Sequence, residues 1–191
     1  MTRVYFVRHA QPDFSHKQDS DRPLSAEGKK DSALVLEILK DLPVDEFYSS
    51  PYRRSYDTIA PAAEYFGKTI RVVEDFHERV AGENGNIKEM FEKRWADFDF
   101  CEEGGESLNS VQKRNINALH TVLKENDGKS IVIGTHGTAL SSILNYFNPD
   151  FNVNCFFRII DWMPYIIELD FDGTKLIGQK ELGHVLKTFR K

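Results

Sequence analysis

The sequence predicts an α/β fold, a three-layer sandwich in which helices flank a mainly parallel central sheet. Strand-like and helix-like segments alternate along most of the chain. Two short, almost wholly apolar runs, "VYFV" at 4–7 and "SIVIG" at 130–134, are typical of strands buried on both faces. Such alternation favours parallel strands joined by helices. With 191 residues, 40% of them hydrophobic and 29% charged, the chain is expected to form one domain over residues 1–191.

The expected helices begin and end at recognisable signals. They are predicted over residues 24–42, 51–67, 87–98, 107–126 and 138–147. Ser25 and Ser107 are suitable N-caps for the first and fourth of these. Pro43 ends the first helix, while Pro51 and Gly67 suit the first turn and the end of the second. The amphipathic pattern of these segments indicates helices that cover a sheet.

Short apolar segments between the helices predict the strands. They are expected over residues 4–7, 45–50, 70–73, 130–137, 156–160, 165–171 and 175–182. Asp172-Gly173 indicates a hairpin turn between the last two strands. The segment 78–105, rich in charge, Gly and Asn, is expected to be a loop-rich excursion from the sheet.

Composition excludes several classes of partner. The formal net charge of -5, without a long basic run, argues against nucleic acid. No apolar run approaches the ~20 residues of a membrane span, and the N-terminus has no signal-peptide pattern. The two cysteines, Cys101 and Cys155, fit neither a zinc site nor a disulfide framework. We therefore expect a cytoplasmic protein without membrane partners.

Two of the expected strands end in histidine. His9 follows the strand at 4–7, and His136 lies at the end of the strand at 130–137. One such histidine is usually an ordinary loop residue. Ligands of open α/β sheets bind at the carboxyl ends of the strands, so two histidines in this position are expected to face one crevice.

Arginines accompany these histidines. Arg8 precedes His9, and Arg53 and Arg54 lie at the start of the helix over 51–67. Guanidinium groups, imidazoles and a helix N-terminus together suit a tetrahedral oxyanion such as phosphate. Histidine is a competent nucleophile toward phosphorus, and cationic neighbours disfavour its protonation. One of Arg53 and Arg54 is expected to be a solvated helix residue.

Taken together, these segments resemble the histidine phosphatase superfamily, the phosphoglycerate-mutase-like proteins. The matching segments, in the family's order, are "VRHA" (7–10), "LSAEG" (24–28), "SPYRRSYDT" (50–58), "ERVAG" (78–82), "GGES" (104–107) and "VIGTHG" (132–137). The order and the context of several segments make the resemblance specific. It implies the phosphoglycerate-mutase-like form of the α/β sandwich, and its spacing assigns the second arginine to Arg54.

The resemblance also implies roles for individual residues. His9 is the phosphorylated nucleophile, Glu78 protonates the leaving oxygen, and His136 helps to hold the phosphoryl group. The complete set is catalytic His9, Glu78, His136, Arg8 and Arg54, with substrate binding by Arg8, Arg54, Gln11, Ser15 and the backbone of Gly137. No metal and no other cofactor is implied, because arginines neutralise the phosphoryl charge.

The segment after Glu78 favours a phosphatase acting on a small phosphomonoester. Residues 80–105 contain three basic residues, Lys88, Lys93 and Arg94, against seven acidic ones. That balance opposes a multiply anionic substrate. Two alternatives stay open: a phosphoglycerate-mutase-type phosphotransferase and, less favoured, a catalytically weak module that binds phosphorylated ligands. The substrate and the oligomeric state are left open. The aromatic residues of this segment are expected to be core more than lid.

Overall fold

A six-stranded sheet forms the centre of the protein, in the order β3-β2-β4-β1-β5-β6. The structure is a computed structural model that describes residues 1–187. Its strands are β1 (Thr2–Arg8), β2 (Glu46–Ser49), β3 (Ile70–Val72), β4 (Ser130–Thr135), β5 (Trp162–Asp172) and β6 (Lys175–Leu186). β1 to β4 pair in parallel, and the hairpin β5–β6 extends the sheet antiparallel to β1. The sheet is therefore mainly parallel, as the sequence predicts.

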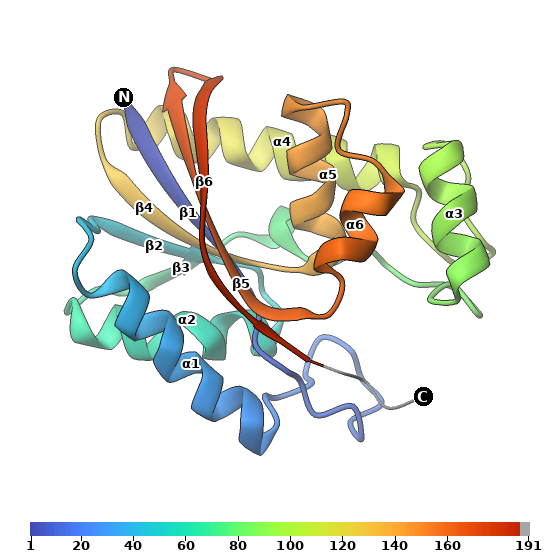
Figure 1. Ribbon diagram of the computed structural model, residues 1–191, viewed down its shortest axis with the longest axis horizontal. Helices are drawn as coiled ribbons and strands as arrows, with labels where there is room; N and C mark the ends of the chain where they lie inside the picture. Colours follow the sequence, from blue (N-terminus) through green and yellow to red (C-terminus); the bar gives the residue numbers. More distant parts are fainter. Residues whose placement is uncertain (188–191) are drawn as a thin grey trace.

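Helices cover both faces of this sheet (Figure 1). They are α1 (Ala26–Leu39), α2 (Arg53–Tyr65), the 3-10 turn η1 (Glu74–Phe76), α3 (Lys88–Ala96), α4 (Leu108–Glu125), α5 (Gly137–Phe147) and α6 (Val153–Ile159). α1 and α2 pack together on one face, and α4 and α5 lie on the other (Figure 1). The three-layer sandwich expected from the sequence is confirmed.

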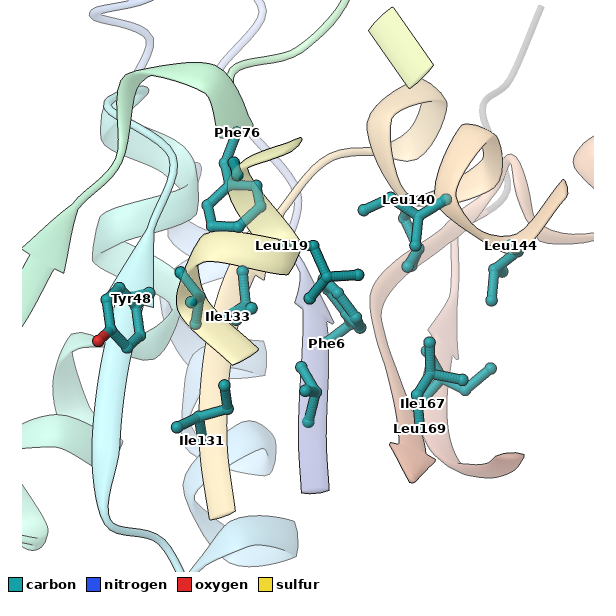
Figure 2. Close-up of a cluster of buried hydrophobic side chains, with 14 of the residues drawn as sticks. Phe6, Tyr48, Phe76, Leu119, Ile131, Ile133, Leu140, Leu144, Ile167 and Leu169 are labelled. Carbon is teal, nitrogen blue, oxygen red and sulfur yellow. The ribbon is translucent and has the colours of Figure 1, made fainter. Parts of the chain in front are cut away.

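Each face of the sheet has its own hydrophobic core. Alternate residues of β1 point to opposite faces: Tyr5 and Val7 join the cluster under α1 and α2, and Val4 and Phe6 join the cluster under α4 and α5. Figure 2 shows the second cluster, in which Leu119 of α4 lies against the strands. A strand covered on both faces has no polar side, which explains the apolar runs in β1 and β4.

The predicted helix caps are confirmed, with shifts at some ends. The Ser25 side chain accepts the Gly28 N–H at 3.0 Å, and Ser107 accepts the Ser110 N–H at 3.2 Å. α2 begins at Arg53 rather than at the predicted Pro51, because the hydroxyl of Ser50 accepts the Tyr52 N–H at 3.1 Å and forms a turn first. The hairpin turn lies one residue later than predicted, since Asp172 still pairs with Lys175.

The strand predicted over 156–160 is wrong, because this segment belongs to α6. The side chain of Asn152 accepts the Asn154 N–H at 2.9 Å and caps the helix. Phe156 and Ile159, three positions apart, are both buried, as on one face of a helix. A short apolar run does not distinguish strand from helix by periodicity, so the cap and the packing decide. The correction matters because the last carbonyl of α6 lies at the site described next.

Candidate active site

Three parallel strands end at the same edge of the sheet and carry the site. In β1 and β4, Arg8 pairs with Thr135, so the next residues, His9 and His136, lie side by side. Their ring centroids are 5.3 Å apart. β2 ends beside β4, and the hydroxyl of Ser50, which follows β2, lies 2.7 Å from Nε2 of His136. The convergence that the sequence predicts for the two histidines is present.

His9 is held as a neutral imidazole with one nitrogen that makes no hydrogen bond within residues 1–187. Its Nδ1 lies 2.8 Å from the carbonyl oxygen of Ala10. A carbonyl only accepts hydrogen bonds, so Nδ1 carries the proton and Nε2 keeps its lone pair. Burial, together with the charges of Arg54 and Arg8, holds the pKa of His9 well below its ordinary value. His9 therefore has the protonation state of a nucleophile.

His136 has the complementary arrangement. The Ser50 hydroxyl accepts the Tyr52 N–H, so its own proton can go to Nε2 of His136. Nδ1 of His136 then carries the proton, and this buried atom has no partner among residues 1–187. Burial and the charges of Arg54, His9 and Arg8 lower the pKa of His136. A buried N–H without a partner beside His9 is a donor suited to an oxyanion.

Arg8 is buried between α6 and α5. Its Nη1 donates to the carbonyls of Ile159 at 2.6 Å and Trp162 at 3.2 Å. Burial lowers the pKa of Arg8 to about 10, so the group is still a cation at neutral pH. Its Nε is buried and without a partner in the described part of the chain. The carbonyls of Ile159 and Trp162 thus orient the Arg8 guanidinium through Nη1, and Nε is left as a donor for a ligand.

Arg54, and not Arg53, is the second arginine of the site. Arg54 is buried, and its guanidinium binds the backbone carbonyl of Asp19 at 2.6 Å and the Asp19 carboxylate at 3.2 Å. The ring of Tyr52 lies against it, 5.0 Å from centroid to guanidinium carbon. Arg53 is exposed and paired with Asp57 at 3.3 Å. The helical phase separates the two neighbours, because adjacent helix positions face different directions.

Glu78 lies at the N-terminus of α5. Its carboxylate accepts the N–H groups of Thr138 and Ala139, both at 3.0 Å, and that of Arg79 at 2.8 Å. Exposed N–H groups and the helix dipole favour an anion at this point. The Glu78 carboxylate therefore occupies the N-terminus of α5 in this structure.

Contacts with α4 hold the backbone segment that contains Glu78 in place. Phe76 of η1 is fully buried in the cluster of Figure 2. Arg114 of α4 donates to the carbonyls of Asp75 at 2.8 Å, His77 at 2.7 Å and Glu78 at 3.2 Å. These contacts set the backbone that positions the Glu78 carboxylate.

Further along, a buried ion cluster anchors the excursion. Arg79 and Arg94 both bind the carboxylate of Glu102, at 2.7 and 2.8 Å. Burial alone would raise the pKa of Glu102, but hydrogen bonds from the backbone and from Arg79 hold it at about 2. The exposed lysines of α3, Lys88 and Lys93, pair with carboxylates of their own helix. None of the three basic residues noted in this segment lies on the cavity wall.

A cavity of about 630 Å³ opens in front of His9. Of the predicted site residues, its wall contains Arg8, His9, Arg54, Glu78 and Gly137, and His136 lies against the ring of His9. Gln11 and Ser15 are not wall residues: the Gln11 carbonyl accepts the Ser25 N–H, and exposed Ser15 bonds to Asp13.

Several wall residues were not predicted. They are Pro12, Phe14, Asp19, Arg22, Tyr52, Arg79, Val80, Ala81, Asn86, Phe91, Thr138, Phe156, Ile160, Asp161 and Met163. Tyr52 lies inside the segment "SPYRRSYDT" and was detectable there. Asp19 and Arg22 belong to an irregular loop, whose path no periodic pattern reveals. The aromatic residue Phe91 lies on the wall, while Trp95 packs on Phe98 and Phe156.

The family model of the histidine phosphatase superfamily (branch 1) matches residues 4–173. This chain belongs to the histidine phosphatase superfamily. Within the superfamily, an uncharacterised phosphatase of Bacillus subtilis, PhoE, is 30% identical over 149 residues, which cover 75% of this chain and 76% of that protein. Phosphoserine phosphatase 1 of Hydrogenobacter thermophilus is 31% identical over 152 residues, or 71% of each chain.

A solved structure supports the superfamily's fold for this chain. Phosphoserine phosphatase of Entamoeba histolytica, in complex with 3-phosphoglyceric acid, matches with a TM-score of 0.76 and 21% identity over 98% of both chains. Across residues 1–187, no helix combines the length and apolar content needed to cross a membrane. The same residues contain no group of three or more His, Cys, Asp or Glu side chains placed to hold a metal ion.

A substitution at Gly137 tests whether activity depends on the close packing of the Arg8 guanidinium against the start of α5. A Cβ on Gly137 would lie 3.1 Å from Nη2 of Arg8, which two carbonyls hold in place. Gly137→Ala is expected to lower kcat/KM for a phosphomonoester by about 10- to 100-fold, through displacement of Arg8. Gly178→Ala is the matched control, because its Cβ would meet the Asp170 carboxylate at an ordinary 3.4 Å. Equal activity of the two variants would contradict this role of Gly137.

The buried histidines predict a pH-dependent stability. The pKa values of His9 and His136 are lowered in the folded protein from 6.5. Below pH 6.5 these histidines are protonated in the unfolded chain and stay neutral in the folded chain. The free energy of unfolding should therefore decrease as the pH is lowered, by up to about 1.4 kcal/mol per pH unit for each histidine. Urea unfolding between pH 7.5 and 5.5 measures this slope, and His9→Gln should remove about half of it. The same slope in His9→Gln would contradict the assignment.

Proposed function

We propose that this protein is a phosphatase that hydrolyses a small phosphomonoester through a phosphohistidine on His9, without a metal ion. The observation that carries the proposal is the state of His9, a buried, neutral imidazole on a cavity wall that also contains two buried arginines, Arg8 and Arg54. Its Nε2 makes no hydrogen bond within residues 1–187. Positioning and charge neutralisation are the main requirements of phosphoryl transfer.

In the first step, the lone pair of His9 Nε2 attacks phosphorus, and the bond from phosphorus to the ester oxygen breaks. The departing oxygen keeps that electron pair and takes a proton from the Glu78 carboxyl group. Arg8, Arg54 and the Nδ1–H of His136 hold the phosphoryl oxygens, whose charge spreads in the transition state.

In the second step, water attacks the phosphohistidine and gives a proton to the Glu78 carboxylate. The P–N bond breaks, its electron pair returns to Nε2, and inorganic phosphate leaves. Glu78 has to exchange its hydrogen bonds to Thr138 and Ala139 for one to the substrate. A phosphate dianion near the carboxylate favours its protonated form, which bonds less well to these N–H groups.

Hydrolysis is favoured over the mutase alternative by the excursion after Glu78. A mutase of this type needs a second anion site, but the basic residues of α3 are paired with carboxylates and do not reach the cavity. We further propose that residues 1–191 act as one domain in the cytoplasm. The continuous sheet from β3 to β6 and the two free thiols, Cys101 and Cys155, support these assignments.

The test is phosphate release from a panel of phosphomonoesters that includes p-nitrophenyl phosphate, with EDTA present. Release that is indifferent to EDTA, with acid-labile phosphate on the enzyme during turnover, is the expected result. No release from any compound would overturn the hydrolase proposal. Phosphate moved within the substrate would identify a mutase.

A further inference from the structure

Asp161 is a carboxylate on the cavity wall that the proposed mechanism does not use. It lies in the turn between α6 and β5, and the carbonyls on either side of this turn, those of Ile159 and Trp162, hold Arg8. The Asp161 carbonyl accepts the Lys187 N–H at 2.8 Å, so the turn is also tied to the end of β6. Burial lowers the pKa of Arg8, and the charges of Glu78 and Asp161 oppose that effect. Asp161 is thus a fixed negative charge close to the phosphate end of the cavity.

The other charged groups of the wall already have partners. Arg54 and Arg22 share the Asp19 carboxylate, with an Arg22–Asp19 distance of 2.6 Å. Arg79 is paired with Glu102, which it shares with Arg94, and Glu78 is bound to the α5 N-terminus. Among residues 1–187, no hydrogen bond or ion pair is made by the Asp161 carboxylate.

The charge balance of the wall indicates what Asp161 can bind. Four arginines of the wall, Arg8, Arg22, Arg54 and Arg79, face three carboxylates, Asp19, Glu78 and Asp161. Glu102 is not on the wall and is shared by Arg79 and Arg94. The empty wall therefore has a surplus of one positive charge, and a phosphate dianion reverses its sign. The proton on Glu78 restores the balance, and the Asp161 carboxylate is left for a cation on the leaving group. A carboxylate beside Asp161 would add repulsion instead.

We propose that Asp161 binds a protonated amine on the leaving group, so that phosphomonoesters of amino alcohols are the preferred substrates. This inference depends on the proposed phosphatase function. The rest of the leaving-group region suits a short carbon chain, because Phe91, Phe156, Ile160 and Met163 supply apolar wall. A charged group beside apolar side chains fixes the orientation of a ligand and provides specificity.

The experiment compares two substrates of nearly equal shape, O-phosphoethanolamine and n-propyl phosphate, which differ in the terminal ammonium. Wild type is expected to favour O-phosphoethanolamine in kcat/KM by about 10- to 100-fold, the value of a charge-assisted hydrogen bond. Asp161→Asn should bring this ratio close to one, by lowering kcat/KM for O-phosphoethanolamine more than kcat/KM for n-propyl phosphate or p-nitrophenyl phosphate. Asp150→Asn, an exposed aspartate before α6, is the matched control and should keep the wild-type ratio.

Each outcome has a distinct meaning. A wild-type ratio near one, or a ratio unaffected by Asp161→Asn, overturns the amine site. Equal loss on all substrates, p-nitrophenyl phosphate included, shows that Asp161 acts only on Arg8 and also overturns it. Where an alkyl phosphate is turned over too slowly, its Ki against p-nitrophenyl phosphate gives the same ratio. No hydrolysis of p-nitrophenyl phosphate or any other ester by wild type is a failure of the proposed function itself.

Discussion

His9→Ala is expected to lower phosphate release by at least ~10³-fold, because the variant has no nucleophile and the arginines alone cannot form a covalent intermediate. The protein should remain folded, since the imidazole makes only one hydrogen bond within the described chain, to the Ala10 carbonyl. Acid-labile phosphate on the protein, measured after rapid mixing with radiolabelled substrate, should be absent from the variant.

His120→Ala is the matched control for His9→Ala. His120 lies on α4 and is not a residue of the cavity wall. Its substitution is expected to leave phosphate release and labelling close to those of wild type. Persistent labelling in His9→Ala would show that another residue is the nucleophile, even if turnover were lost.

Glu78→Gln is expected to have an effect that depends on the leaving group. An alkyl phosphate needs a proton on its departing oxygen, so kcat should fall by ~10²- to 10⁴-fold. A 2,4-dinitrophenyl ester leaves readily without a proton, so its phosphorylation of His9 should be slowed less than about tenfold. Water attack on phosphohistidine still lacks its base. The variant should release one equivalent of dinitrophenolate in a burst and then turn over slowly.

Glu83→Gln provides the control, because Glu83 is an exposed carboxylate in the same excursion. It should show neither the leaving-group dependence nor the burst. An equal loss on alkyl and dinitrophenyl esters by Glu78→Gln would indicate that Glu78 supports the fold of the site, through the α5 N–H groups, and does not transfer a proton.

The parts of the site at strand ends were predictable from the sequence. β1 and β4 are apolar because both faces are covered, and that apolar pattern locates their ends to within a residue or two. Parallel strands place His9 and His136 at the same edge. The apolar pattern of each strand is local in the sequence. Because the two strands are parallel neighbours, the residues at their carboxyl ends lie close together.

The loop after His9 could not be predicted in the same way. Gln11 and Ser15 were expected to bind the substrate but are not among the residues of the cavity wall, while Asp19 from the same loop binds Arg54. An irregular loop has no repeating pattern, and its path is decided by the partners it meets. Here those partners are Arg54 and the Arg53 N–H, which donates to the Ser20 carbonyl at 2.9 Å.

The sandwich, the two histidines at one edge of the sheet and the selection of Arg54 over Arg53 follow from local patterns in the sequence. The three-dimensional arrangement adds that residues 156–160 end a helix, that the Ile159 carbonyl orients Arg8, and that the Asp161 carboxylate makes no hydrogen bond or ion pair within residues 1–187. These two groups of features differ in the range of the interactions that produce them. Apolar periodicity and caps act within a few residues, whereas Arg8 and Ile159 are 151 positions apart and meet only when the sheet has formed.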